Sequence, residues 1–254
     1  MSVTTSKTFF PAFLKTLGIL FLYIFVGLFI DSKYVVSTYQ ESQWIANALM
    51  VIIFSIVLWK VSPRIRELMI YAVLIGYVGE YLFSVVLGMY TYRLENVPHY
   101  IPMGHALVYI GVLYFTKTAY VKLNKNLLEK IFTGIIIVYA AAFLVFKNDV
   151  FGFVLTVLTL WILRNKPRER LFYLTMYLSI VFLEITGTSY ESWEWPSIAW
   201  DYFTFLPSAN PPSGISFFYF GLDLGCLWLY KKRHHIAWKR MKNQRKIRLK
   251  ESNS

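Results

Sequence analysis

Long runs of hydrophobic residues alternate with short polar segments along the chain, and each run is about as long as a membrane-spanning helix. A helix needs about 20 apolar residues to cross about 30 Å of hydrocarbon. Only Asn148 and Asp149 separate the fifth run from the sixth, so a kinked or re-entrant hairpin is an alternative there. The pattern predicts eight spans, near residues 12–30, 44–60, 67–88, 101–118, 131–147, 149–164, 171–188 and 213–230.

The composition strengthens this interpretation. Hydrophobic residues make up 57% of the 254 residues and charged residues 16%, against about 25% charged residues in ordinary soluble domains. This excludes a conventional water-soluble enzyme. The first run is too long for a signal peptide and lacks a convincing cleavage site, so we expect a retained span. Cys226 is the single cysteine and no zinc-type Cys/His spacing occurs in the sequence, so we expect no disulfide, metal or cofactor.

The positive charges lie in every second loop. The loops after the second, fourth and sixth spans are rich in Lys and Arg, as is the C-terminal segment, whereas the alternate loops carry mostly Asp and Glu. Because positively charged flanks stay in the cytoplasm during insertion, we expect a multi-pass protein with both termini cytoplasmic, in a bacterial inner membrane. The tail contains ten Lys and Arg within residues 231–250 and should lie on anionic inner-leaflet lipids. It has no folded motif that reads bases, so we expect no specific nucleic-acid partner.

Internal similarity indicates a tandem duplication. At an offset of 104 residues, the Pro-Arg loop at 63–66 matches the one at 167–170, and Glu80 matches Glu184. At an offset of 110, residues 102, 104, 109 and 111 match residues 212, 214, 219 and 221. Four spans per copy give both copies the same orientation. The predicted fold is an all-α polytopic membrane protein with two parallel four-helix repeats, residues 1–120 and 121–230, followed by a basic tail, residues 231–254.

Three carboxyl groups fall within predicted spans, where a charge is costly unless it has a partner, water or a proton. Glu80, Glu184 and Asp223 all lie between the outer surface and the midplane, and the outer halves of the spans contain no Lys or Arg. At least one carboxyl should therefore stay protonated near neutral pH and be able to act as an acid. Alternatively, the glutamates bond backbone or tyrosine groups and hold the repeats together.

Further candidates lie near the same surface. His105 begins the fourth span, where a lone histidine is more often an interfacial residue than a base. Pro and Gly in both long outer loops force non-helical backbone, so we expect these loops to fold back as lids. Aromatic side chains are mostly core or interfacial, but here they could also line a slot for a polyene-like lipid and stabilise a cation. The candidate catalytic residues are Glu80, Glu184, Asp223 and His105, and the candidate substrate-binding residues are Tyr81, Tyr90, Tyr92, Tyr109, Trp193, Trp195 and Tyr219.

One combination of these residues resembles a known family. Across residues 63–118, and more faintly 167–230, the pattern of Glu80, Gly88, Tyr90, Tyr92, Pro98 and Pro102 is similar to membrane-bound carotenoid-biosynthesis proteins, namely bacterioruberin-type carotenoid hydratases and, more distantly, lycopene-cyclase-domain proteins. The resemblance implies that a buried carboxylic acid protonates a double bond of an isoprenoid and that water or the chain itself captures the cation. The Pro-x-Glu-Glu element of the cyclase domains is missing at 102–105 and 212–215, which favours hydration over ring closure.

Three functions remain open at this point. A lipid-modifying enzyme of the hydratase or lyase type, acting on a lipid-soluble substrate in the membrane, requires the three carboxyls to converge on one slot open sideways to lipid. A small-molecule or ion transporter requires a wet path to them from both faces. A non-catalytic membrane scaffold would place each carboxyl in a separate tyrosine-bonded pocket.

Overall fold

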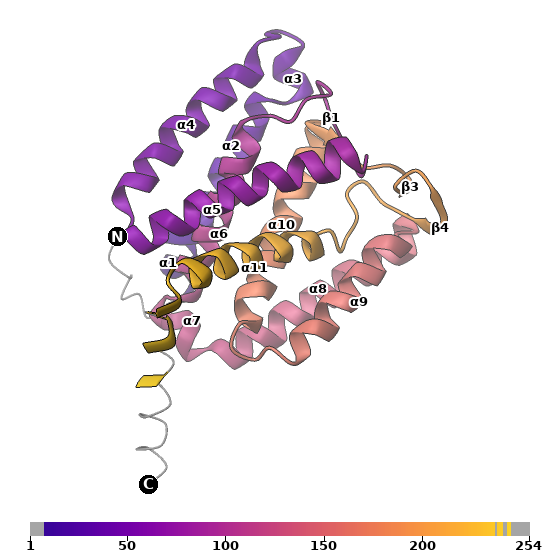
Figure 1. Ribbon diagram of the computed structural model, residues 1–254. Helices are drawn as coiled ribbons and strands as arrows, with labels where there is room; N and C mark the ends of the chain where they lie inside the picture. Colours follow the sequence, from indigo (N-terminus) through magenta and orange to yellow (C-terminus); the bar gives the residue numbers. More distant parts are fainter. Residues whose placement is uncertain (1–7, 237, 241–242, 245–254) are drawn as a thin grey trace.

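The computed structural model describes residues 8–236, 238–240 and 243–244, and the fold is a bundle of helices (Figure 1). Helices make up 74% of the structure, and within the described residues the strands form two short antiparallel pairs. The helical segments are α1 (Phe9–Phe13), a π-helical turn (Leu14–Gly18), α2 (Ile19–Ile30), α3 (Lys33–Val36), α4 (Ser42–Lys60), α5 (Pro63–Glu80), a second π-helical turn (Tyr81–Val86), α6 (Tyr100–Thr116), α7 (Ala119–Leu123), α8 (Lys125–Lys147), α9 (Val150–Arg164), α10 (Arg170–Ser189) and α11 (Ser216–Arg233); the strands are β1 (Thr91–Tyr92), β2 (Trp193–Glu194), β3 (Ile198–Ala199) and β4 (Phe203–Pro207).

Five helical segments of the described chain are long and apolar enough to cross a membrane: Phe9–Val36, Ser42–Lys60, Pro63–Val86, Lys125–Lys147 and Arg170–Ser189. Helices α6 and α9 are apolar but shorter, with 17 and 15 residues. Helix α11 contains Asp223 and ends in Lys231, Lys232 and Arg233, and it is not among the five. The helical class and the apolar character are therefore confirmed, whereas the number of eight spans stays a prediction.

Local sequence sets several helix ends. Pro63 occupies the first turn of α5, where its missing N–H costs nothing. Helix α8 ends at Asn148, which has a left-handed backbone with a φ of 53°. Asp149 then caps α9 by accepting a hydrogen bond from the Gly152 N–H. Two residues thus divide the fifth and sixth apolar runs into separate helices, which pack against each other (Figure 1).

Helix α10 lies at the centre of the bundle. In its most apolar stretch 61% of the residues are buried, compared with 17% in α8. It contacts α2 and α6 from the first half of the chain, while α11 lies beside α5 (Figure 1). The two halves therefore interlock through α10 and α11. The proposed duplication and the repeat boundaries at residues 120 and 230 stay predictions.

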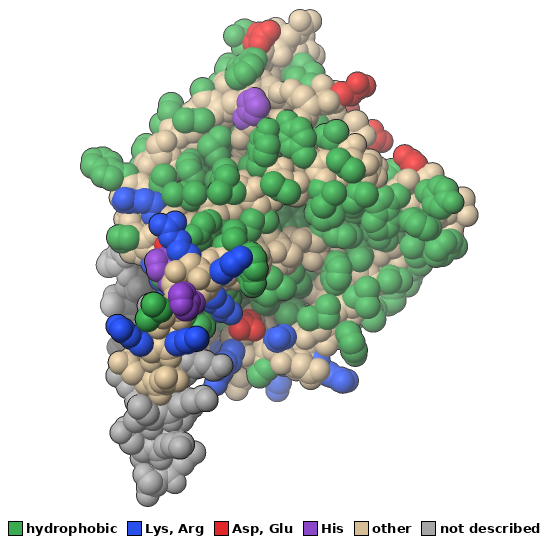
Figure 2. Space-filling view, viewed as in Figure 1, with side chains coloured by type: hydrophobic (Ala, Val, Ile, Leu, Met, Phe, Trp, Pro, Cys, Tyr) green, Lys and Arg blue, Asp and Glu red, His purple; other side chains and the backbone are tan. Residues whose placement is uncertain are grey.

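The surface has the charge pattern of a membrane protein. Figure 2 shows a broad hydrophobic area, with Lys and Arg gathered toward the lower left and bottom and most Asp and Glu at the top and right. Large apolar side chains are almost fully exposed in this monomer, such as Trp59 at 81% and Phe146 at 82%. An exposed apolar surface of this extent is consistent with a membrane protein. Residues 237, 241–242 and 245–254 of the predicted basic tail lie outside the described residues.

Candidate functional site

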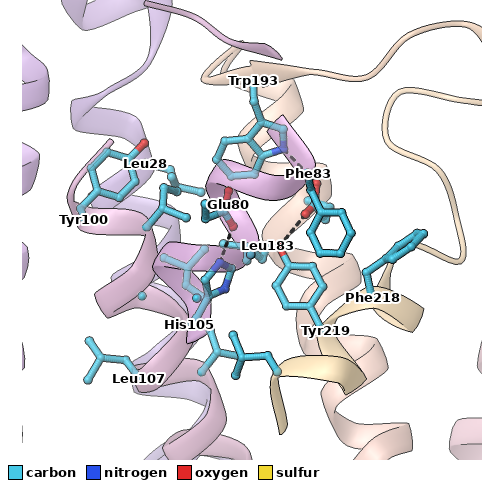
Figure 3. A pocket seen from close by; sticks show the side chains of 18 of the residues that line it. Leu28, Glu80, Phe83, Tyr100, His105, Leu107, Leu183, Trp193, Phe218 and Tyr219 are labelled. Atoms are coloured by element: carbon cyan, nitrogen blue, oxygen red, sulfur yellow. Dashed lines mark hydrogen bonds and ion pairs between the residues drawn. The ribbon is translucent and has the colours of Figure 1, made fainter. Parts of the chain in front are cut away.

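A cavity of about 310 Å³ lies among α2, α4, α5, α6, α10 and α11 and contains most of the predicted polar residues (Figure 3). Its lining is largely apolar, with side chains such as Leu20, Met50 and Phe83. Both Glu80 and Glu184 line it. The structure therefore brings the two matching glutamates of the two halves into one space, and these are two of the three carboxyls that the enzyme hypothesis requires there.

Glu80 is buried at the end of α5 and is held by three side chains. Its Oε2 atom accepts hydrogen bonds of 2.5 Å from the hydroxyls of both Tyr90 and Tyr92. His105 Nε2 lies 2.5 Å from its Oε1 atom. The π-helical turn follows directly after Glu80, and Gly88 then adopts a φ of 58°, a value that favours glycine. The chain thereby turns back and presents two tyrosines, two residues apart, to the same carboxyl group.

Glu184 is buried on α10 in a similar arrangement. Its Oε2 atom accepts hydrogen bonds from the indole N–H groups of Trp193 at 2.9 Å and Trp195 at 3.1 Å. Its Oε1 atom accepts one from the Tyr219 hydroxyl at 2.9 Å. Gly187 makes room for this arrangement, because a Cβ atom there would lie 2.0 Å from the Trp193 ring. The local arrangement matches that of Glu80: two partners follow the glutamate in the loop after its helix and one comes from a later helix.

Each aromatic or imidazole partner of Glu80 contacts one partner of Glu184. β1 pairs with β2, so that Thr91 lies opposite Glu194 and Tyr92 opposite Trp193. The ring centroids are 4.6 Å apart for Tyr90 and Trp195, 6.1 Å for Tyr92 and Trp193, and 5.1 Å for His105 and Tyr219. The loops that follow α5 and α10 are therefore joined directly beside the carboxyls, and both carboxyls belong to one connected cluster.

The two carboxyls differ in the charge of their partners. His105 gives Glu80 a basic partner, and the two form a buried ion pair when the imidazole is protonated. Trp193, Trp195 and Tyr219 are neutral donors, so Glu184 has no counter-charge among its hydrogen-bond partners. No Lys or Arg is among the described residues that line the cavity. This asymmetry distinguishes two sites that otherwise look alike.

The cavity has a mouth on the apolar surface between α5 and α11. Val78 and Leu82 line the cavity and are also 65% and 43% exposed. Gly225 brings the two helices together nearer the basic end of α11, where a Cβ atom on it would lie 3.0 Å from Ile75. A Cβ atom on Gly221 would meet nothing within 4 Å. Gly221 lines the cavity and is exposed, so the absence of a side chain there leaves the mouth open.

The structure separates the predicted site residues into two groups. His105, Tyr90, Tyr92, Trp193, Trp195 and Tyr219 join the glutamates in the cavity. His105 is buried rather than interfacial. It is a basic partner for Glu80, although the outer halves of the predicted spans contain no Lys or Arg. Tyr81 lies outside, because the π-helical turn leaves it 40% exposed beside Tyr77. Tyr109 packs on Phe172 in the core. Asp223 lines a second, much smaller cavity, so the three carboxyls do not converge on one slot.

Two buried aspartates at the ends of apolar runs hold the loops beside the site. Asp31 is buried, pairs with Arg93 and accepts a hydrogen bond of 2.7 Å from the Tyr100 hydroxyl. Asp149 is buried and accepts from the backbone N–H groups of Ala209 at 3.1 Å and Ser213 at 2.7 Å, besides Gly152. Each directly adjoins an apolar run, and nothing in the local sequence tells such a residue from a solvated loop acid.

The chain was also compared with known proteins. No protein-family model, curated protein or solved structure matches it. The resemblance to carotenoid-biosynthesis proteins gains no support from these comparisons, and the argument for function depends on the site alone. Within the described residues, no three His, Cys, Asp or Glu side chains are grouped to hold a metal ion.

Proposed function

We propose that the protein is an integral membrane enzyme that protonates a carbon–carbon double bond of a lipid or isoprenoid substrate. The observation that carries the proposal is that Glu80 and Glu184 share one largely apolar cavity whose mouth lies on the apolar surface. A substrate dissolved in the bilayer would enter sideways. The volume of about 310 Å³ is near the lower end of ordinary ligand sites, so it suits one segment of a long chain whose remainder stays in the membrane.

We assign the acid role to Glu184 because its partners are all neutral. An unpaired carboxylate in a low-dielectric interior is costly, and the three donors around Glu184 bring no positive charge. Glu80 has His105 and can keep its negative charge within an ion pair. One protonated and one ionised carboxyl then face the same substrate segment.

The reaction conserves all atoms and electrons. The O–H bond of the Glu184 acid breaks as a C–H bond forms at one alkene carbon, and the other carbon becomes a cation. The Tyr90 and Trp195 rings and the Glu80 carboxylate stabilise this cation. A water molecule bonds to the cation through its oxygen and returns one proton to Glu184. The net result is hydration of the double bond, and the reverse sequence removes water. A carotenoid-like polyene is the substrate that the family resemblance implies.

Deuterium labelling tests the reaction on a mixture of lipids, so the substrate need not be identified beforehand. The protein is placed in nanodiscs made with lipids from a carotenoid-making host, incubated in deuterated water and extracted. We expect a lipid with carbon-bound deuterium and the added mass of one water. Glu184→Gln should abolish labelling, because an amide cannot supply the proton, and Glu80→Gln should slow it by about 100-fold or more, as expected for a lost catalytic group.

Glu194→Gln is the matched control. Glu194 lies between Trp193 and Trp195 but is exposed, so the same substitution there should leave labelling unchanged. Absence of carbon-bound deuterium with the wild-type protein, or full labelling by Glu184→Gln, contradicts the proposal.

A structural role is the second candidate, because every carboxylate oxygen of Glu80 and Glu184 already accepts a hydrogen bond or faces His105. In that case both Gln variants should lower the thermal unfolding temperature while the wild-type protein labels no lipid. The transporter alternative gains less support, since the cavity lining is mostly apolar and a solute path requires water from both faces.

The membrane arrangement is part of the proposal. Eight spans with cytoplasmic termini would place the basic ends of α5 and α11 on inner-leaflet lipids, and Lys231 and Lys232 continue α11 toward the tail. A fluorescent reporter that folds only in the cytoplasm, fused after residue 254, should be bright in a bacterial host. A dark reporter at normal expression contradicts this topology.

A further inference from the structure

Seven buried side-chain polar atoms have no hydrogen-bond partner among the described residues, and two of the seven belong to residues that line one small cavity. These two are Nδ1 of His105 and Oδ2 of Asp223. The His105 residue is 7% exposed and Asp223 4%. Buried polar atoms are nearly always satisfied by protein or ordered water, so each of these atoms indicates a missing partner.

Both residues line the same small cavity, which is distinct from the large one. Its volume is about 10 Å³, the smallest space in which one water molecule fits. Tyr219 also lines it, and the rest of its wall is apolar: Val108, Met176, Ile180 and Leu222. A buried water needs two to four polar partners, and the two unpartnered atoms provide the first two.

We propose that one water molecule occupies this cavity and links His105 to Asp223. The water accepts a hydrogen bond from Nδ1–H and donates one to Oδ2 of Asp223. Glu80, His105, the water and Asp223 then form one hydrogen-bonded chain from α5 through α6 to α11. Asp223 acts as a positioning residue, because it reaches Glu80 only through the water and the imidazole.

The hydrogen-bonded chain gives both ring nitrogens of His105 a partner. The titratable groups that face the imidazole are Glu80 on one side and Asp223 and Tyr219 on α11. With an acceptor at each nitrogen, the imidazole can donate to the water and to Glu80 at once, and in its protonated form it pairs with Glu80. The water site itself is independent of the proposed function; only the benefit to catalysis rests on it.

Nitrogen NMR of the histidine side chains tests this arrangement without substrate. The full-length protein is ¹⁵N-labelled at histidine in nanodiscs at neutral pH, and the His105 signals are assigned with His105→Gln. In the wild-type protein we expect both ring nitrogens in the protonated range. In Asp223→Leu the Nδ1 signal should move to the unprotonated range, whereas Asp223→Asn, which keeps a carbonyl acceptor, should retain the wild-type position.

A second variant and a high-resolution structure complete the test. Val108→Ile adds a methyl group to the cavity wall and should displace the water and cause the same Nδ1 change, even if Asp223→Leu does not fold. Density should appear within about 3 Å of both atoms in the wild-type protein. Missing density where other buried waters are visible, or an unchanged Nδ1 signal in a folded Asp223→Leu or Val108→Ile variant, overturns the inference. Absence of lipid labelling would overturn the proposed function alone.

Discussion

Replacement of Asp149 should loosen the second outer loop and, through it, the Glu184 site. Asp149 is fully buried and accepts hydrogen bonds from three backbone N–H groups, those of Gly152, Ala209 and Ser213. The loop that it holds contains Asn210, whose Oδ1 atom accepts a hydrogen bond of 3.1 Å from the backbone N–H of Trp195. Asp149 therefore supports the segment that positions the Trp195 indole on Glu184.

The size of the effect follows from these contacts. Asp149→Ala leaves up to three backbone donors unsatisfied, each costing about 1–3 kcal/mol when buried, and the Gly152 bond is also the helix cap, worth about 1 kcal/mol. Allowing for partial relaxation and access of water, we expect the free energy of unfolding to fall by about 3–6 kcal/mol. Asp149→Asn keeps one acceptor oxygen but turns an amide N–H₂ toward a donor, so it should cost about 1.5–3 kcal/mol.

Two measurements in nanodiscs report the loss. The thermal unfolding midpoint of Asp149→Ala should fall by roughly 5–15 °C, from the usual scaling for a chain of this size. Hydrogen exchange at residues 208–214 should accelerate because the Ala209 and Ser213 amides lose their acceptor. The matched control is Asp201→Asn, an exposed aspartate with a left-handed backbone that Asn tolerates. Wild-type exchange rates in this loop of Asp149→Ala would refute the reasoning.

Three further substitutions test the mouth, the first loop and the hydrogen bonds of Glu80. Gly221→Leu should close the mouth and reduce lipid labelling by about tenfold or more without unfolding the protein, whereas Gly134→Leu, at another glycine whose Cβ atom meets nothing within 4 Å, should not; equal labelling in both argues against lateral entry. Arg93→Met leaves Asp31 buried without its ion-pair partner. It should lower the free energy of unfolding, measured by thermal denaturation, by about 3 kcal/mol; an unchanged stability would contradict a structural role of this ion pair. Tyr90→Phe keeps the ring but removes one donor to Glu80 and should cost about 1.5–3 kcal/mol; a loss as large as that of Tyr90→Ala would instead assign the effect to packing.

The three carboxyls within apolar runs differ in how well the sequence predicted their positions. Glu80 and Glu184 could be selected because a carboxyl group inside an apolar run is costly wherever the run packs. Asp223 meets the same criterion, but its side chain does not lie in the large cavity with the two glutamates. Asp223 lies on a face of α11 where it lines a separate small cavity together with residues of α6 and α10, and the packing angle between two helices is not encoded in the hydropathy of either.

The sequence by itself determined that the chain is helical, apolar enough for a membrane and polarised in charge, because span length and the distribution of Lys and Arg are local properties. It also identified the two glutamates and the aromatic residues of the outer loops. Only the tertiary structure decided that His105 faces Glu80, that Tyr81 and Tyr109 lie elsewhere, and that Asp31 and Asp149 are buried anchors. These outcomes depend on which distant segments pack together, and a residue at the end of an apolar run has the same local sequence whether it faces water or a neighbouring loop.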